Sequence, residues 1–188
     1  MKELEIYLQT LLPFKEHELQ TITILFQEKL FNKGQFLAKE GEYSNKVAFI
    51  KQGVLRAYVR TNKGEDYNKT FFTENTFVGA YSSLVTGNIN LINIQCLTDS
   101  TLLVANYKEF TNLYNSIPLI ERFSRIVAER FFVSKENREI QLVTLEAKER
   151  YELFKTEHLG LDQRIPQYHI ASYLGVTPTQ LSRIRATR

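Results

Sequence analysis

The sequence is poor in the residues that build redox and metal sites. Cys96 is its only cysteine, and its three histidines are His17, His158 and His169. An internal disulfide, a multi-cysteine metal site and an iron–sulfur cluster held by one chain are therefore excluded. Cys96 lies in the apolar run INIQCL with no basic residue near it, so we expect a small buried side chain rather than a reactive thiol. The scattered histidines predict no metal or haem ligand set.

Long apolar segments are also missing. No window approaches the roughly 18 uninterrupted apolar residues that a membrane span needs. The N-terminal stretch MKELEIYLQTLLPFKEHE carries acids among its apolar residues and lacks the core of a signal peptide. We therefore expect a cytoplasmic protein without a membrane partner. A hydrophobic content of 43% over 188 residues is sufficient for one sizeable globular domain and a small second one.

Acidic residues are absent from the end of the chain. Residues 148–188 contain seven basic and four acidic residues, and the other 17 basic and 17 acidic residues cancel over positions 1–147. The entire net charge of +3 therefore resides in the last fifth of the sequence. Four arginines and no acid follow Asp162. A local positive field of this kind suits a polyanionic partner, although a charge run alone is often only a solvated face.

Short β-strands are expected over about residues 26–107. Six of the eight glycines punctuate this region, between short runs rich in Val, Ile, Phe, Tyr and Thr. The runs VAFIKQG and VLRAYVR alternate best, and Asn62-Lys63-Gly64 is a candidate hairpin tip before the strand that contains Tyr67. Strands of this length and spacing predict a small barrel or double-sheet jelly roll.

Helices are expected on both sides of the β-region. The stretch HELQTITILF has the apolar spacing of one amphipathic helix after Pro13. A helix of more than twenty residues should begin at Pro118 and run to about Gln141. From the pattern alone, its apolar face packs either against the β-domain of the same chain or against the same helix of a second copy. A shorter helix is expected in LEAKERYELFKTE, followed by a connector, LGLDQRIP, with a possible short strand.

The segment QYHIASYLGVTPTQLSRIRATR carries the clearest functional pattern. A helix from about Gln167 to Leu174 ends at Gly175, a residue that readily adopts positive φ. Thr177 is then a good N-cap, and Pro178 fits the first position of a second helix. A helix, a tight glycine turn and a capped helix are typical of a DNA-reading helix-turn-helix.

Candidate DNA-binding residues follow from this geometry. The outward face of the second helix should present hydrogen-bonding and basic groups to base edges and phosphates. The candidates on this face are Thr179, Gln180, Ser182, Arg183 and Arg185, to which we add Thr177 at its start and Gln167 and Tyr168 of the first helix.

The segment RIPQYHIASYLGVTPTQLSRIR resembles the helix-turn-helix of Crp/Fnr-type transcription regulators. The glycine-punctuated region (KGQFLAKEGEYSNKVAFIKQGVLRAY, then FFTENTFVGAY) is similar to the family's cyclic-nucleotide-binding β-roll. The resemblance implies an α+β fold: a jelly-roll-like, double-stranded β-roll sensor domain at 1–117, a dimer helix at 118–143 and a winged-helix-like helix-turn-helix domain at 144–188. Any wing should be short or missing. The implied partners are double-stranded DNA, a second copy of the chain and RNA polymerase.

The effector site departs from the family pattern. Nucleotide-binding members carry a glutamate after the F-G pair and an arginine about ten residues later, whereas this chain has Ala80 and Asn90 there. No lysine or arginine occurs from Thr70 to Asp99. A buried phosphate would lack a compensating cation, so we expect no response to cyclic AMP. We also expect no cofactor. Another small effector could still use the following residues: Phe77, Gly79, Ala80, Tyr81, Ser82, Ser83 and Asn90.

Two other function classes fit the composition less well. A cupin-like enzyme needs histidine and carboxylate ligands on its strands, but the β-region has no histidine, and no catalytic residues are evident. A regulatory protein that acts through protein partners would use the terminal helices as a docking surface. The arginines without nearby acids favour DNA instead.

Overall fold

The computed structural model describes residues 1–186 and groups them into two compact units. The N-terminal unit comprises residues 1–57 and 71–128. The C-terminal unit comprises residues 58–70 and the chain from Glu129 onward. The tip of one β-hairpin therefore belongs with the C-terminal helices rather than with the other strands. Thr187 and Arg188 lie outside the described residues.

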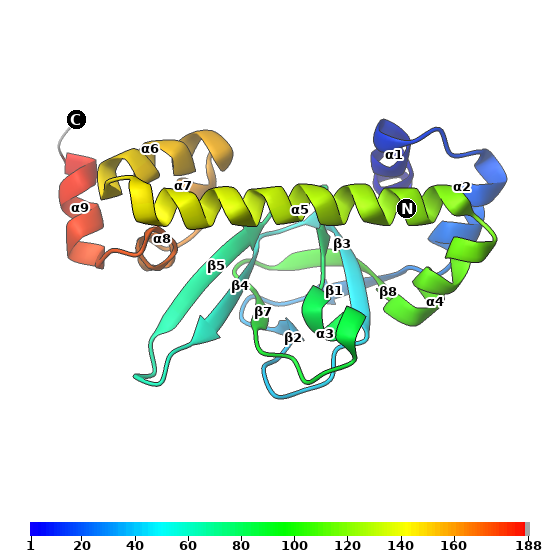
Figure 1. Cartoon of the computed structure of the whole chain (residues 1–188), viewed down its shortest axis with the longest axis horizontal. Coiled ribbons are helices and arrows are strands. Elements are labelled where there is room, and N and C mark those ends of the chain that lie inside the picture. Colours follow the sequence, from blue (N-terminus) through cyan, green and yellow to red (C-terminus); the bar gives the residue numbers. More distant parts are fainter. Residues whose placement is uncertain (187–188) are drawn as a thin grey trace. The chain divides into compact units, whose positions relative to one another are not determined.

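Two helices precede the strands, a short helix lies between the sixth and seventh strands, and the remaining helices follow the last strand (Figure 1). The strands are β1 (Gln27–Phe31), β2 (Phe36–Ala38), β3 (Lys46–Gln52), β4 (Leu55–Arg60), β5 (Asp66–Phe72), β6 (Phe77–Val78), β7 (Asn93–Cys96) and β8 (Ser100–Asn106). The helices are α1 (Lys2–Leu11), α2 (Glu16–Thr23), α3 (Tyr81–Thr86), α4 (Tyr107–Asn112), α5 (Pro118–Thr144), α6 (Ala147–Glu157), α7 (Leu161–Arg164), α8 (Gln167–Leu174) and α9 (Pro178–Ala186), with a 3-10 turn at Leu113–Asn115.

The strands form two four-stranded sheets, in the orders β1-β8-β3-β6 and β2-β7-β4-β5. This is the double-sheet β-roll expected from the sequence. In β3, Ala48 and Ile50 pack between the sheets, whereas Phe49 packs against the helices. Both faces of this sheet are therefore buried, which is why the strand is continuously apolar instead of alternating. In β4 even Arg56 is buried, with Nε and Nη2 both donating to Oε1 of Gln95 at 3.0 and 2.8 Å.

The helical predictions were partly wrong. Helix α1 was not predicted, although Leu4 and Leu8 are spaced by one turn and fully buried. The possible strand in the connector is wrong, because α7 forms there behind Gly160 at φ +71°. The long helix begins at Pro118 as predicted and continues three residues past Gln141 to Thr144. The predicted turn at Asn62-Lys63-Gly64 joins β4 to β5, with Gly64 at φ +80°.

The two halves of α5 differ in burial. Ile120 and Phe123 lie in the core with β3, β8 and the N-terminal helices. The interpretation that the helix packs on the β-domain of its own chain is thus confirmed for its first half. The second half exposes large apolar side chains, of which Phe132 is 67% and Val143 is 87% exposed.

Candidate nucleic-acid interface

Helices α8 and α9 form the predicted helix-turn-helix. Helix α8 ends at Gly175, which has φ +68° and ψ 33°, a left-handed conformation that glycine adopts without steric cost. The Val176 N–H then returns to the Ala171 carbonyl at 3.0 Å, which fixes the turn. Helix α9 begins at Pro178, where no N–H is needed.

Thr177 caps α9 reciprocally with Gln180. The Thr177 hydroxyl accepts the Gln180 N–H at 3.2 Å, and Oε1 of Gln180 accepts the Thr177 N–H at 2.9 Å. This is a capping box that satisfies two otherwise orphaned donors. The side-chain oxygen of Gln180 is therefore engaged in the helix start, and a DNA-reading role for this side chain stays a prediction.

The inner side of the module is an apolar wedge. Ile170 and Ala171 are fully buried, and Leu174 and Leu181 are each 1% exposed. The small Ala171 side chain lets the two helices approach closely. Arg150 of α6 donates from Nε to the Leu174 carbonyl at 3.0 Å, so a cation satisfies the C-terminal end of α8. The orientation of α9 is thus fixed by packing and by its neighbours.

The outer side of α9 is polar and basic. Thr179, Ser182, Arg183 and Arg185 are all exposed. Helix α9 contains no carboxylate, and both arginines lie in its last turn. These groups can donate to phosphates and to base edges, which is the chemistry a recognition helix needs.

The two candidates on α8 differ from each other. Tyr168 is 57% exposed, and its ring centroid lies 4.1 Å from that of His169. Gln167 is half-buried, and its Nε2 donates to the Asp162 carbonyl at 2.8 Å. Its amide therefore stabilises the module's own fold, and contact of Gln167 with DNA stays a prediction.

A β-hairpin arm packs on α8, which the sequence did not reveal. Asn68 of β5 has no exposed surface and donates from Nδ2 to the His169 carbonyl at 2.9 Å. The Ser172 hydroxyl accepts the Asn68 N–H at 3.0 Å and donates to the Asp66 carbonyl at 2.6 Å. A buried asparagine in a strand could have signalled such a contact, but nothing local identifies its partner. His169 is only 5% exposed, so it contributes to this packing and not to a surface.

The predicted effector residues do not all line one cavity. Phe77 packs in the aromatic core, with its ring centroid 5.3 Å from that of Phe123 and 5.5 Å from that of Phe49. A Cβ on Gly79 would lie 2.9 Å from Cδ1 of Leu84 and 3.3 Å from the Lys46 carbonyl, so a side chain here would require Leu84 to move.

The polar effector candidates are mostly occupied by main chain. Asn90 is 3% exposed and donates from Nδ2 to the carbonyls of Lys39 and Ile92. The Ser83 hydroxyl donates to the Asn88 carbonyl at 2.6 Å. Ala80 is buried, whereas Tyr81 and Ser82 are exposed. The amide of Asn90 thus holds loops together instead of facing a ligand.

Other site classes find no support in the described part of the chain. Residues 1–186 contain no group of three or more His, Cys, Asp or Glu side chains that could hold a metal ion. No helix within the same residues has the length and apolar character of a membrane crossing. Cys96 is 1% exposed, and burial raises the pKa of its thiol, as expected of a structural cysteine.

Comparisons with known proteins agree with this architecture. Residues 28–116 match the cyclic nucleotide-binding domain family. A search of curated proteins finds no significant match. Among solved structures, FixK2 from Bradyrhizobium japonicum has a TM-score of 0.75 at 18% identity, covering 86% of this chain and 83% of its own.

Two further structures show the same likeness. A transcriptional regulator of the Crp/Fnr family from Eubacterium rectale has a TM-score of 0.72 at 14% identity, with 91% of this chain and 82% of its own covered. The c-di-GMP responsive global regulator CLP of Xanthomonas campestris has a TM-score of 0.71 at 12% identity, with coverages of 89% and 88%. Residues 28–116 therefore resemble the cyclic nucleotide-binding domain, and the chain as a whole has the fold seen in FixK2 and in the Crp/Fnr-family structure from Eubacterium rectale.

Proposed function

We propose that the chain is a sequence-specific DNA-binding transcription regulator whose helix α9 enters the major groove. The observation that carries this proposal is the exposed, carboxylate-free face of α9, with Ser182, Arg183 and Arg185 on it. The opposite side of the same helix is anchored by Leu181. A rigidly held helix with outward arginines can form bidentate bonds to guanine edges and pair with phosphates.

The proposal includes a homodimer formed along α5. Phe132 and Val143 lie three turns apart on one side of its second half, and Val133 and Ile140 lie on the adjacent stripe. All four are more than half exposed: Phe132 67%, Val133 52%, Ile140 54% and Val143 87%. Covering such a surface favours association. A two-fold dimer would present two recognition helices about 34 Å apart to a near-palindromic operator.

The proposal excludes cyclic AMP as the effector. Ala80 occupies the position where nucleotide-binding relatives carry a glutamate, and the Asn90 amide is already bonded to two main-chain carbonyls. Isothermal titration with cyclic AMP and cyclic GMP should show no saturable binding. Micromolar affinity for either nucleotide would contradict this part of the proposal. Contact with RNA polymerase and a cytoplasmic location belong to the same proposal, by analogy with the regulators that share the fold.

The decisive experiment is selection of genomic DNA by the purified protein, followed by anisotropy titration of the selected duplex. Arg183→Ala should weaken specific binding by about 1–3 kcal/mol. Arg122→Ala, which removes an exposed arginine from α5, is the matched control and should bind like wild type. Wild-type affinity should also fall steeply with salt. If Arg183→Ala bound as tightly as Arg122→Ala, or if wild type selected no duplex, the alternative of a regulator acting through protein partners would be favoured.

A further inference from the structure

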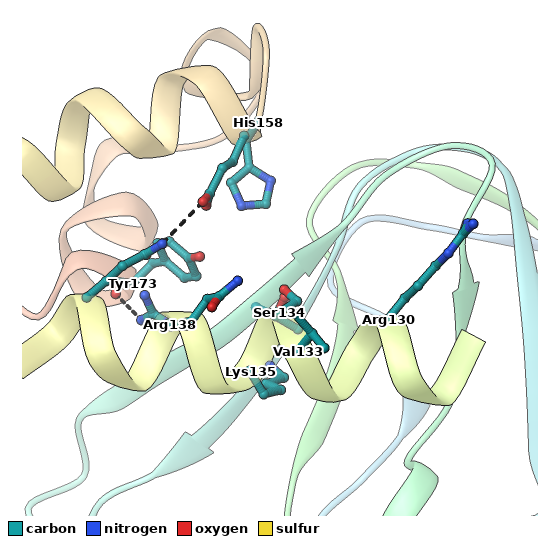
Figure 2. Close-up of a pocket in the computed structure, with 11 residues that line it drawn as sticks. Arg130, Val133, Ser134, Lys135, Arg138, His158 and Tyr173 are labelled. Carbon is teal, nitrogen blue, oxygen red and sulfur yellow. Dashed lines mark hydrogen bonds between the residues drawn. The ribbon is translucent and has the colours of Figure 1, made fainter. Parts of the chain in front are cut away.

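A cavity of about 360 Å³ lies within the C-terminal unit, beside the second half of α5. Figure 2 shows Arg138 and Lys135 of α5, His158 at the end of α6 and Tyr173 of α8 among the residues that line it. All its lining residues belong to the same compact unit. A volume of this size is sufficient for a small metabolite. The DNA-binding face of α9 contributes none of these residues.

Arg138 brings a buried positive charge to this cavity. Arg138 is only 8% exposed, and its guanidinium lies 3.6 Å from the ring centroid of Tyr173. Nη2 donates to the Tyr173 carbonyl and, at 3.5 Å, to the Tyr67 hydroxyl. These partners are neutral, and within residues 1–186 no carboxylate forms an ion pair with Arg138. A buried guanidinium with neutral partners alone is poorly compensated.

Lys135 adds a second cation one turn away. Its Nζ donates to the Lys69 carbonyl at 3.4 Å and lies 4.9 Å from the ring centroid of Phe131. Burial, together with repulsion from Lys69 and Arg138, lowers the pKa of Lys135 to about 8. Lys135 and Arg138 both line the cavity, so an anion placed between them would be stabilised by two positive charges.

The remaining wall does not neutralise this charge. Glu157 is the one carboxylate among the lining residues, and its Oε1 accepts the Nε2 of Gln141 at 3.3 Å. Burial lowers the pKa of His158, so its ring is neutral at pH 7 and can offer a hydrogen bond to a ligand. Arg130 is a third cation in the lining. Three cations thus face one carboxylate.

We propose that this cavity binds a small phosphorylated metabolite, with the phosphate held by Arg138 and Lys135. A phosphate dianion supplies two charges and several acceptors, which matches a planar guanidinium beside an ammonium better than one carboxylate does. The depth of Arg138 suits a small ligand and not the backbone of a duplex. The ligand would compensate the buried charge, and it would contact the same element, α8, that carries the helix-turn-helix. The binding step itself does not depend on the proposed DNA-binding function.

The test is a titration of the full chain without DNA, in phosphate-free buffer, with pyrophosphate as the probe and citrate as a carboxylate comparison. Isothermal titration should show one saturable pyrophosphate site per chain, and thermal unfolding should shift upward with the probe. Lys135→Gln should weaken binding by about tenfold or more, since a charge-assisted hydrogen bond is lost. Lys135→Arg should retain binding. Arg122→Gln, an exposed charge on the same helix, is the control and should change nothing.

Measuring pyrophosphate affinity as a function of pH distinguishes direct binding by Lys135 from a purely structural role of this residue. Wild-type affinity should fall as the pH rises through about 8, because Lys135 loses its proton there. Lys135→Arg keeps its charge, and the probe's own ionisation is common to both proteins, so their difference isolates Lys135. Absence of pyrophosphate binding, equal affinity for citrate, or equal losses in Lys135→Gln and Arg122→Gln would each overturn the proposal. If the protein binds DNA but not pyrophosphate, the cavity proposal fails and the proposed DNA-binding function stands.

Discussion

Asn68 donates its side-chain amide to the main-chain carbonyl of His169, a residue 101 positions further along the chain, at 2.9 Å. Asn68 has no exposed surface, so water cannot replace a lost partner there. The hydrogen bond connects the β4–β5 hairpin arm to the first helix of the helix-turn-helix inside one compact unit. The stability of the helix-turn-helix should therefore depend on a residue of the β-region.

Replacing Asn68 tests this dependence. Asn68→Ala removes the side-chain hydrogen bond to the His169 carbonyl from a buried site, which should cost about 1–3 kcal/mol in free energy of unfolding. Urea denaturation followed by circular dichroism measures the change. Asn62→Ala, at the exposed tip of the same hairpin, is the control and should stay within about 0.5 kcal/mol of wild type. Similar midpoints for the two variants would contradict the prediction.

Gly175 should be sensitive to any Cβ that disfavours positive φ. A Cβ at this position would lie 3.7 Å from Cδ2 of Leu142, an ordinary contact, so space is not the obstacle. The left-handed backbone at φ +68° is the obstacle, and Gly175→Ala should destabilise the protein by about 1–2 kcal/mol. Gly175→Asn should be milder, because asparagine tolerates this conformation. Thermal unfolding of the two variants checks the order, and an equal loss would argue for a steric cause instead.

Substitution of Thr177 should affect protein stability, whereas substitution of Thr179 should affect DNA binding. Thr177→Ala removes the cap of α9 and should cost about 0.5–2 kcal/mol in stability. Thr179→Ala removes an exposed hydroxyl from the outer face, so it should leave stability unchanged and weaken DNA binding. Paired denaturation and anisotropy titrations separate these outcomes. If Thr179→Ala destabilised the protein as much as Thr177→Ala, the capping assignment would be wrong.

The pKa of Lys135 predicts how stability depends on pH. In the folded protein this pKa is about 8, against an ordinary value of 10.5. Between these values the unfolded chain binds more protons, so stability should rise as the pH increases from about 8 to 10.5. Lys135→Met removes the buried charge and should flatten this rise while raising stability at pH 7. Urea midpoints measured across the range decide the point, and an unchanged slope in the variant would count against it.

The sequence predicted well those elements that are defined by local chemistry. Pro118 at a helix start, Gly175 at a helix end and Thr177 at an N-cap each act through their own backbone, so their roles could be assigned from type and order. The β-roll followed from spaced glycines and short β-branched runs for the same reason. Helix α1 was missed because its apolar positions Leu4 and Leu8 are interspersed with acids.

The contacts that complete the site join distant parts of the chain, so they could not be predicted from local sequence patterns. Neither the capture of Asn68 by α8 nor the stacking of Arg138 on Tyr173 leaves a pattern within either segment. A polar residue at a helix start, such as Gln167, suits both DNA contact and local bonding, and its bond to the Asp162 carbonyl could not be inferred from residue type. Pairwise geometry, not residue type, separates these possibilities.

Ser172 gives the edge of a sheet an unusual protection. Strand β5 is the last strand of its sheet, and end strands tend to recruit foreign strands through their unsatisfied main-chain groups. The Ser172 hydroxyl occupies one such donor, the Asn68 N–H, and one acceptor, the Asp66 carbonyl. If α8 moved away from this arm, the main-chain donor and acceptor of β5 would lose their partner, and the exposed edge strand would favour aggregation. We therefore expect the contact between the hairpin arm and α8 to persist during any conformational change of the protein.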